Sequence, residues 1–236
     1  MKTKYLTNII PSYNRAKYLD LRLKELHSLK DRINIIVIDD FSPEEYIIDL
    51  KSSNVKLIRN PKNLGRGNSI IKAIKYVETK FLTIFDDDDE INASNLSLII
   101  DKLNFLDHNC IGLIGETDQF TEPLPNKIKD YLYYRFNTNW KDKKEFVKTN
   151  HLKNSLPFWL KGRRIPTSFI FSLCDRKKMY WEYCDIQVVK KNYLDGGMTS
   201  LVKTNFFKKS IIITLIYWLY RNARVFKKKL IWNSNS

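Results

Sequence analysis

Four consecutive aspartates, Asp86 to Asp89, are the residues of this sequence best suited to chemistry. Adjacent carboxylates repel one another, so four of them at the end of a buried strand are unfavourable without a compensating cation. Residues 81–85 are apolar and β-rich, and they predict such a strand. Clustered carboxylate oxygens suit Mg²⁺ or Mn²⁺, which keep open positions for phosphate oxygens. The run therefore predicts a metal site for a diphosphate, and the alternative is a solvated acidic turn.

Three more polar turns follow apolar runs earlier in the chain. Residues 11–15 (Pro-Ser-Tyr-Asn-Arg) include an aromatic side chain that could cover a planar base or pack at a sheet edge. Asp39-Asp40 precede a serine-proline-glutamate pattern typical of a capped helix, which leaves one carboxylate to accept the imide N–H of uracil. Residues 60–68 form a polar loop with two glycines. The dinucleotide-binding pattern Gly-x-Gly-x-x-Gly is absent.

The elements between these turns must position them. Over the first 115 residues, short β-branched runs alternate with helical patterns. The expected strands are 6–10, 33–38, 55–58, 81–85 and 111–114, and the expected helices are 17–29, 44–50, 69–77 and 94–106. This alternation predicts an α/β fold with a mostly parallel sheet and helices on both faces. Ligands of such sheets bind beyond the carboxyl ends of the strands, where all four turns meet. The second half is less regular, with a helix expected near 168–178 and a strand near 186–189.

Composition bounds the class of protein. A chain of 236 residues with 43% hydrophobic residues can form one substantial domain. The three cysteines, Cys110, Cys174 and Cys184, lack metal-ligand spacing and fit a reducing cytosol. No run approaches the roughly 20 apolar residues of a membrane span, so we expect a cytoplasmic protein, dissolved or peripheral at the inner face of the plasma membrane.

The charge is strongly basic and unevenly placed. The formal net charge is +15, and no acidic residue follows Asp195. Residues Phe206–Leu230 combine an apolar stretch, 211–220, with basic residues on either side. This pattern predicts a basic amphipathic helix that contacts an anionic membrane. The alternative is a helix that packs on the core and has a solvated basic end.

The ordered set of motifs resembles the family 2 glycosyltransferases of GT-A fold, of the bacterial surface-polysaccharide type. The resemblance covers roughly residues 5–115 and is carried by Ile9–Arg15, Val37–Ser42, Asn63-Leu64-Gly65 and Phe85–Asp89. It implies a nucleotide-sugar donor, usually linked to UDP, and a divalent metal, Mn²⁺ or Mg²⁺. The residues that it places at the base are Pro11 and Tyr13, with Asp40 at the uracil. Asp86 would lie near the ribose and sugar, and Asp88 would be the principal metal ligand beside Asp86. The other implied donor-binding residues are Asn14, Arg15, Asn63, Arg66 and Asp87.

The second half carries a weaker resemblance. Tyr193–Ser200 is similar to a closing motif of bacterial members that build O-antigen, capsule or lipooligosaccharide. Where those relatives carry acidic residues, this chain has Arg163 and Thr167. Because one of those acids is the usual catalytic base, the base must be sought among other carboxylates. Asp175 and Glu116 are our candidates.

The sequence therefore predicts an inverting glycosyltransferase that moves a sugar from a UDP-sugar to a hydroxyl of a bacterial surface glycan, which could be polyprenyl-linked. We expect a nucleotide-sugar-binding half at 1–115, an acceptor-side half of the same domain at 116–205, and a basic tail at 206–236. The alternatives are a metal-dependent nucleotidyltransferase and a non-catalytic basic protein that binds nucleic acid or membrane. Acidic strand ends would repel a nucleic acid, so no such partner is expected.

Overall fold

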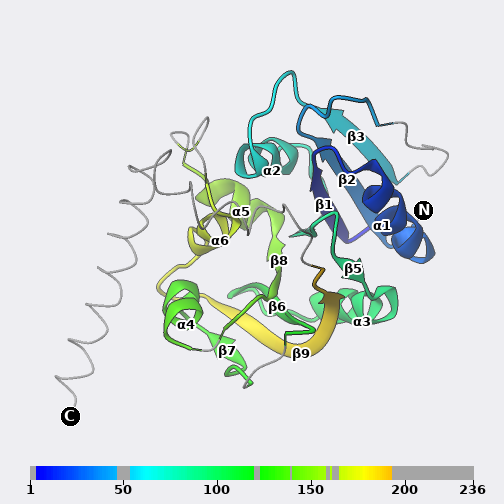
Figure 1. Cartoon of the computed structure of the whole chain (residues 1–236). Coiled ribbons are helices and arrows are strands. Elements are labelled where there is room, and N and C mark those ends of the chain that lie inside the picture. Colours follow the sequence, from blue (N-terminus) through cyan, green and yellow to red (C-terminus); the bar gives the residue numbers. More distant parts are fainter. Residues whose placement is uncertain are drawn as a thin grey trace, which may run out of the picture.

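The computed structural model describes residues 4–46, 54–119, 123–138, 140–157, 160 and 165–192. Within them, a nine-stranded sheet has the order β3-β2-β1-β4-β8-β6-β9-β5, and β7 pairs with β9 (Figure 1). The strands are β1 (Leu6–Ser12), β2 (Ile33–Asp39), β3 (Val55–Arg59), β4 (Phe81–Ile84), β5 (Glu90–Ile91), β6 (Cys110–Thr117), β7 (Lys127–Ile128), β8 (Lys144–Lys148) and β9 (Tyr180–Lys190).

The first four strands of the order are mutually parallel, as the alternating pattern predicts. β1 pairs in parallel with both β2 and β4, and β2 pairs in parallel with β3. β8 then lies antiparallel between β4 and β6, and β6 is parallel to β9. Because β8 comes from the second half of the sequence, both halves contribute to the same sheet.

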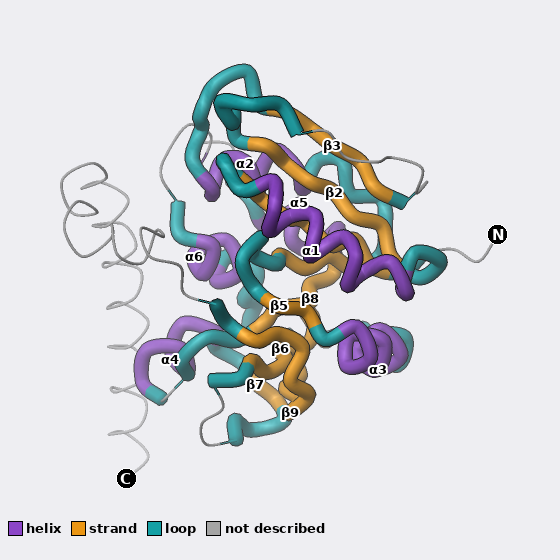
Figure 2. The backbone as a smooth tube through the Cα atoms, turned by 45° about the vertical axis from the view of Figure 1, so that its right-hand side comes forward, coloured by secondary structure: helices purple, strands orange, loops and turns teal. Residues whose placement is uncertain are grey.

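Helices cover both faces of the sheet (Figures 1 and 2). One face carries α1 (Ala16–Leu26), which continues into a 3₁₀ turn at His27–Leu29, and α3 (Ala93–Leu103). The other carries α2 (Arg66–Ile74), α4 (Tyr131–Asn137), α5 (Thr149–Ser155) and α6 (Thr167–Ser172). The predicted fold class is confirmed.

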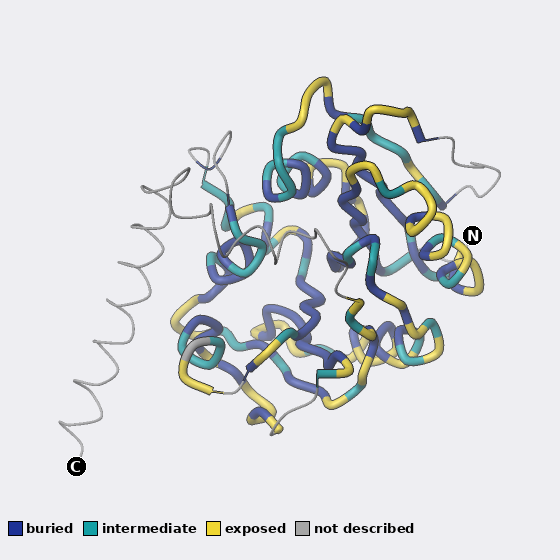
Figure 3. The backbone as a smooth tube through the Cα atoms, viewed as in Figure 1, coloured by how far each residue is buried: buried dark blue, intermediate teal, exposed yellow. Residues whose placement is uncertain are grey.

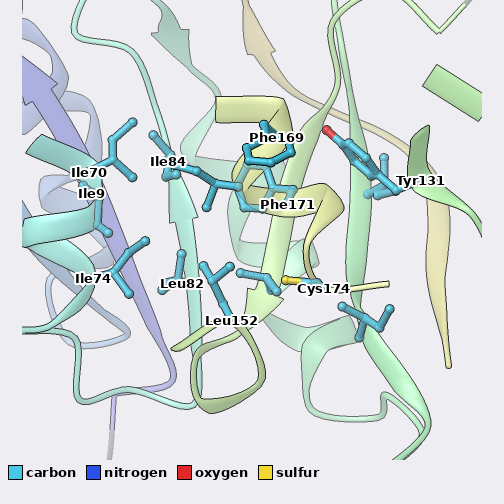
Figure 4. Packing of buried hydrophobic residues seen from close by; sticks show 14 of the residues in the cluster. Ile9, Ile70, Ile74, Leu82, Ile84, Tyr131, Leu152, Phe169, Phe171 and Cys174 are labelled. Atoms are coloured by element: carbon cyan, nitrogen blue, oxygen red, sulfur yellow. The ribbon is translucent and has the colours of Figure 1, made fainter. Parts of the chain in front are cut away.

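Alternation along the strands divides the core into two layers. In β1, Leu6 and Ile10 face α1 and α3, whereas Ile9 faces α2. The strands β1, β2, β4, β6 and β8 are mostly buried, β3 and β9 are partly exposed, and the outer helix surfaces are exposed (Figure 3). In the α2-side layer, Ile70 and Ile74 of α2 lie over Ile9 of the sheet (Figure 4). Each fully buried aliphatic side chain contributes about 1.5–3 kcal/mol, which fixes the strand ends that carry the polar turns.

Some expected elements differ in the structure. The helix expected at 44–50 does not begin where predicted, because residues 44–46 are not helical, and residues 47–50 lie outside the described residues. Ser42 does not cap a helix: its Oγ donates to Asp39 and accepts the backbone N–H of Asn14. The helix expected at 168–178 is the shorter α6, and the strand expected at 186–189 is the longer β9.

The three cysteines are buried and free. Among the described residues, no helix combines the length and the apolar character needed to cross a bilayer. The predicted tail helix and the motif at 193–200 lie outside the described residues.

Candidate functional site

Hydrogen bonds join the turns that follow the parallel strands. Ser12 at the end of β1 donates to Asp87 Oδ2 at 2.6 Å, and Arg15 Nη1 lies 3.0 Å from the other oxygen of Asp87. The backbone N–H of Asn14 donates to Ser42 Oγ at 2.8 Å, which links the turns after β1 and β2. The turns meet because parallel strands end at one edge of the sheet.

Asp40 organises the loop between β3 and α2. Its Oδ1 accepts hydrogen bonds from Asn60 Nδ2 and the Leu64 N–H, and its Oδ2 accepts one from the Gly65 N–H, all at 2.8 Å. Gly65 has φ +81°, which only glycine adopts without strain. An ionised carboxylate has about four acceptor positions, and hydrogen bonds from described residues use three of those of Asp40.

Two exposed aromatic residues flank this turn. Tyr13 follows β1 with 47% of its surface exposed, and Phe41 follows Asp40 with 46% exposed. The Arg59 guanidinium lies 5.3 Å from the centre of the Phe41 ring. Of the predicted base-site residues, Tyr13 is on the surface, whereas Pro11 is buried in β1 opposite Ile38. Phe41 was not predicted. The sequence feature that could have indicated Phe41 is an apolar residue between Asp40 and Ser42, where no strand or helix accounts for an apolar side chain.

Four basic side chains neutralise the acidic run. Arg15 contacts Asp87 and Asp88, the latter at 2.6 Å, and Arg66 contacts Asp86. Two lysines contact both Asp86 and Asp89: Lys191 Nζ lies 3.1 Å and 2.8 Å from them, and Lys144 Nζ lies 3.8 Å and 3.0 Å. The sequence leads us to expect a metal ion that compensates the repulsion among the four aspartates. In the structure, four cationic side chains of the protein supply this compensation.

The four aspartates divide into an inner and an outer pair. The side chains of Asp87 and Asp89 are 5% and 2% exposed, whereas those of Asp86 and Asp88 are 26% and 16% exposed. Burial alone would raise the pKa of Asp86, but Arg66, Lys144 and Lys191 hold it well below its usual range. Burial raises the pKa of Asp88, and the neighbouring charges of Asp86 and Asp89 raise it further against the effect of Arg15. The outer pair is therefore Asp86 and Asp88, the two predicted metal ligands.

Comparison with known proteins identifies the family. Residues 7–159, more than half of the chain, match the sequence profile of Glycosyl transferase family 2. The chain belongs to glycosyl transferase family 2.

Relatives of this family 2 chain extend the comparison. A dolichyl-phosphate beta-glucosyltransferase of Dictyostelium discoideum is 27% identical over 126 residues, covering 47% of this chain and 38% of that protein. S. aureus TarS 1–349 in complex with UDP-GlcNAc aligns with a TM-score of 0.59 and 19% identity, over 83% of this chain and 60% of that one. The mannosyltransferase PcManGT of Pyrobaculum calidifontis, in complex with GDP-Man and Mn²⁺, aligns with a TM-score of 0.59 and 12% identity, over 85% and 60%. The two structures share the GT-A fold, and the chain spans less than two thirds of each of these three proteins.

The outer aspartates of this family 2 chain have the chemistry of a divalent-metal site. Carboxylate oxygens are preferred ligands of Mg²⁺ and Mn²⁺. Among the described residues, no group of three or more histidine, cysteine, aspartate or glutamate side chains is arranged to hold a metal ion. Mg²⁺ commonly binds through one or two carboxylates and completes its shell with water and substrate phosphates. Asp86 and Asp88 fit an ion held in that way.

The two predicted catalytic bases are engaged elsewhere. Glu116 is buried and accepts hydrogen bonds from Lys143 Nζ at 2.8 Å and from Tyr183 Oη at 2.6 Å. Asp175 is buried beyond the C-terminal end of α6 and accepts from the Tyr131 N–H and from Trp181 Nε1. Their catalytic roles remain predictions, and the structure shows both carboxylates binding buried donors.

The other sequence-predicted residues are arranged as follows. Thr167, at the first residue of α6, accepts a hydrogen bond from Arg66 and so borders the acidic run. Asn63 is exposed in the loop before α2. Arg163 lies outside the described residues. Two carboxylates that were not predicted also lie near Lys191: Asp118 Oδ1 accepts the Lys191 N–H, and Asp142 Oδ2 lies 3.9 Å from Lys191 Nζ. Sequence reasoning missed Lys144, Lys191 and Asp142, because nothing in their local sequence marks them.

Proposed function

We propose that this chain transfers a sugar from a UDP-sugar to a hydroxyl of a glycan acceptor. Membership of glycosyl transferase family 2 supports the reaction class. The S. aureus and Pyrobaculum calidifontis structures of the same fold are complexes with UDP-GlcNAc and with GDP-Man, which supports a nucleoside diphosphate sugar as donor. The observation that carries the proposal is the convergence of the Asp40 turn and the Asp86–Asp89 run at one sheet edge, where a base and a diphosphate can be bound together.

The base and the diphosphate of the donor each have matching groups in this site. Asp40 Oδ2 would accept the imide N–H of uracil, and Tyr13 and Phe41 would cover the base. Arg15, Arg66, Lys144 and Lys191 surround the carboxylates where the diphosphate would lie. A divalent ion on Asp86 and Asp88 would neutralise the charge that develops on the diphosphate as the glycosidic bond breaks.

The acceptor is proposed from the sequence and one relative. The resemblance of residues 193–200 to O-antigen, capsule and lipooligosaccharide transferases supports a bacterial surface glycan. The relative named for dolichyl phosphate supports a polyprenyl-linked acceptor. An inverting transfer needs a carboxylate to take the proton of the attacking hydroxyl. Asp175 and Glu116 remain the predicted bases for this step.

A ligand screen tests the donor class. Thermal denaturation of the protein would be followed with UDP, UDP-sugars, GDP-sugars, ATP and a short RNA, each with Mn²⁺ and with EDTA. We expect UDP and UDP-sugars with Mn²⁺ to raise the melting temperature more than the other ligands. A larger rise with ATP would indicate a nucleotidyltransferase, and a larger rise with RNA would indicate a nucleic-acid-binding protein. Either result would overturn the proposal.

A further inference from the structure

A buried lysine, Lys191, lies against the carboxylates that would otherwise attract a free metal ion. Lys191 Nζ lies between the carboxylates of Asp86 and Asp89, at 3.1 Å and 2.8 Å, and its side chain is only 10% exposed. A lysine side chain carries a positive charge at neutral pH, so Lys191 faces both carboxylates as a cation. Lys191 contacts Oδ2 of Asp86 and Arg66 contacts Oδ1, so a divalent ion would have to compete with a protein cation for either oxygen.

The sheet keeps this cation in place. Lys191 directly follows the last residue of β9, and Lys144 is the first residue of β8. β8 lies between β4 and β6, and β9 pairs with β6, so both lysines extend from the interior of the sheet. They are therefore fixed beside the acidic run rather than supplied by a flexible surface chain.

The charges of the cluster nearly cancel before any ligand binds. Five carboxylates, those of Asp86 to Asp89 and of Asp142, contact the cationic groups of Arg15, Arg66, Lys144 and Lys191, so the formal sum is −1. A divalent ion alone would change this sum to +1 in a partly buried site. A diphosphate with two negative charges alone would change it to −3. The ion and the diphosphate together leave the sum at −1, and the phosphates also provide the ligands that the two outer carboxylates lack.

We propose that Lys191 is a resident counter-ion that prevents free divalent metal from binding, so that metal and donor diphosphate enter the site as a unit. This inference rests on the proposed function and adds the order of binding to it. The sheet holds the backbone of Lys191, and its side chain turns from Asp86 to the phosphates only when these accompany the metal and offer the ammonium a new anionic partner. Metal and UDP must then strengthen each other's binding by the same factor, because coupling between two ligands is reciprocal.

Binding measurements on the full chain test this role without any assay of turnover. Free Mn²⁺ would be measured by electron paramagnetic resonance, and UDP binding would be measured by calorimetry in EDTA and in Mn²⁺. In the wild type we expect weak binding of each ligand alone and at least a tenfold gain for each in the presence of the other. Lys191→Met should bind Mn²⁺ alone at least tenfold more tightly than the wild type, with a smaller gain from UDP.

Matched variants separate the effect of removing the charge of Lys191 from an effect on folding. Lys190→Met removes a neighbouring lysine that is 58% exposed and pairs with Glu90 at 3.3 Å, so it should bind both ligands as the wild type does. Lys191→Arg keeps the positive charge and should restore the weak binding of free Mn²⁺. If Lys191→Met fails to fold in a thermal denaturation control, Lys144→Met removes a charge from the same carboxylates and should show the same gain.

Two results would overturn the inference. One is an unchanged affinity of folded Lys191→Met for free Mn²⁺, and the other is a wild type that binds Mn²⁺ as tightly without UDP as with it. A wild type that binds no UDP even with Mn²⁺ would instead overturn the proposed function. The failure of the two proposals can therefore be distinguished.

Discussion

At the scale of single residues, backbone strain coincides with an exposed aromatic side chain. Phe41 has φ +71°, in the left-handed region that bulky residues avoid. Asn14, with φ +55°, is a type that tolerates this region, whereas Phe41 is not. Strained residues persist where the surrounding structure holds them, and they cluster at ligand sites. The Phe41 ring is thus held at the surface beside Asp40 at an energetic cost.

Phe41→Gly should separate this strain from binding. Glycine adopts positive φ freely, which recovers about 1–2 kcal/mol, while its extra chain entropy costs about 0.5–1 kcal/mol. We therefore expect a free energy of unfolding within about 1 kcal/mol of the wild type, measured by urea denaturation. Stacking of a base on an aromatic side chain is worth about 1–3 kcal/mol, so UDP affinity measured by calorimetry with Mn²⁺ should fall about fivefold or more.

Phe105→Gly is the matched control for this prediction. Phe105 is also exposed, but it lies in the turn before β6 begins, at the opposite edge of the sheet from the strand ends. Its substitution should leave UDP binding unchanged. Equal UDP affinity in Phe41→Gly and the wild type would show that the Phe41 ring does not contact the base.

The acidic half of the site and two of its four basic residues, Arg15 and Arg66, could be predicted from the sequence, whereas Lys144 and Lys191 could not. Asp40 and Asp86 to Asp89 were predictable because each follows a recognisable buried strand. Lys191 is 102 residues from Asp89 in the chain, and Lys144 is 55 residues from it. Only the pairing of β8 and β9 into the sheet brings them together. Local patterns could therefore suggest that a cation was required but could not show that the protein supplies it.

At the scale of elements, charged residues that are buried make a strand difficult to predict from its hydrophobic pattern. β8 reads Lys-Glu-Phe-Val-Lys, and its first two residues are charged yet buried. Lys144 is tolerated there because it meets Asp89, and Glu145 because it accepts a hydrogen bond from the Tyr131 hydroxyl. Burial raises the pKa of Glu145 against the effect of Arg135. The four parallel strands are mainly apolar and were predictable, whereas β8 depends on distant partners that no local window contains.

Asp175 connects two elements of the second half, and this position predicts a structural role. Its carboxylate accepts the N–H of Tyr131, the first residue of α4, at 3.0 Å and Trp181 Nε1 of β9 at 3.2 Å. Asp175→Ala leaves two buried donors without this acceptor, so urea denaturation should show a loss of about 2–5 kcal/mol. Asp175→Asn keeps a carbonyl acceptor and should lose less.

Turnover distinguishes this structural role from the predicted catalytic one. If Asp175 positions α4 and β9, folded Asp175→Asn should transfer sugar at close to the wild-type rate. Removal of a general base typically lowers the rate by about 10²–10⁴-fold, and a loss of that size would restore Asp175 as the base. Asp101→Ala is the stability control, because it removes an exposed ion pair with Arg32 that is worth at most about 1 kcal/mol.

At the scale of the whole molecule, the excess positive charge does not belong to the site. The cluster at the strand ends carries a formal charge of −1, from five carboxylates and four cations, while the chain as a whole carries +15. After Asp195 there are only basic charged residues, namely Lys203, Lys208, Lys209, Arg221, Arg224, Lys227, Lys228 and Lys229. A glycosyltransferase that acts on a polyprenyl-linked acceptor must meet its substrate at a membrane surface. The basic tail is therefore the feature that would bring the acidic donor site to an anionic bilayer.

Truncation after Asn205 should accordingly weaken membrane association without weakening donor binding. Each basic residue near anionic lipid contributes about 1 kcal/mol, so removal of the seven that follow Asn205 should lower vesicle binding at least tenfold at low salt. Sedimentation with vesicles containing phosphatidylserine measures this, and vesicles of phosphatidylcholine alone are the control for charge. Lys227, Lys228 and Lys229 replaced by glutamine should give an intermediate loss, which tests charge without shortening the chain. If the truncated and full-length chains sediment equally, the tail does not bind the membrane. If the truncated chain also loses UDP binding, the tail supports the donor site instead.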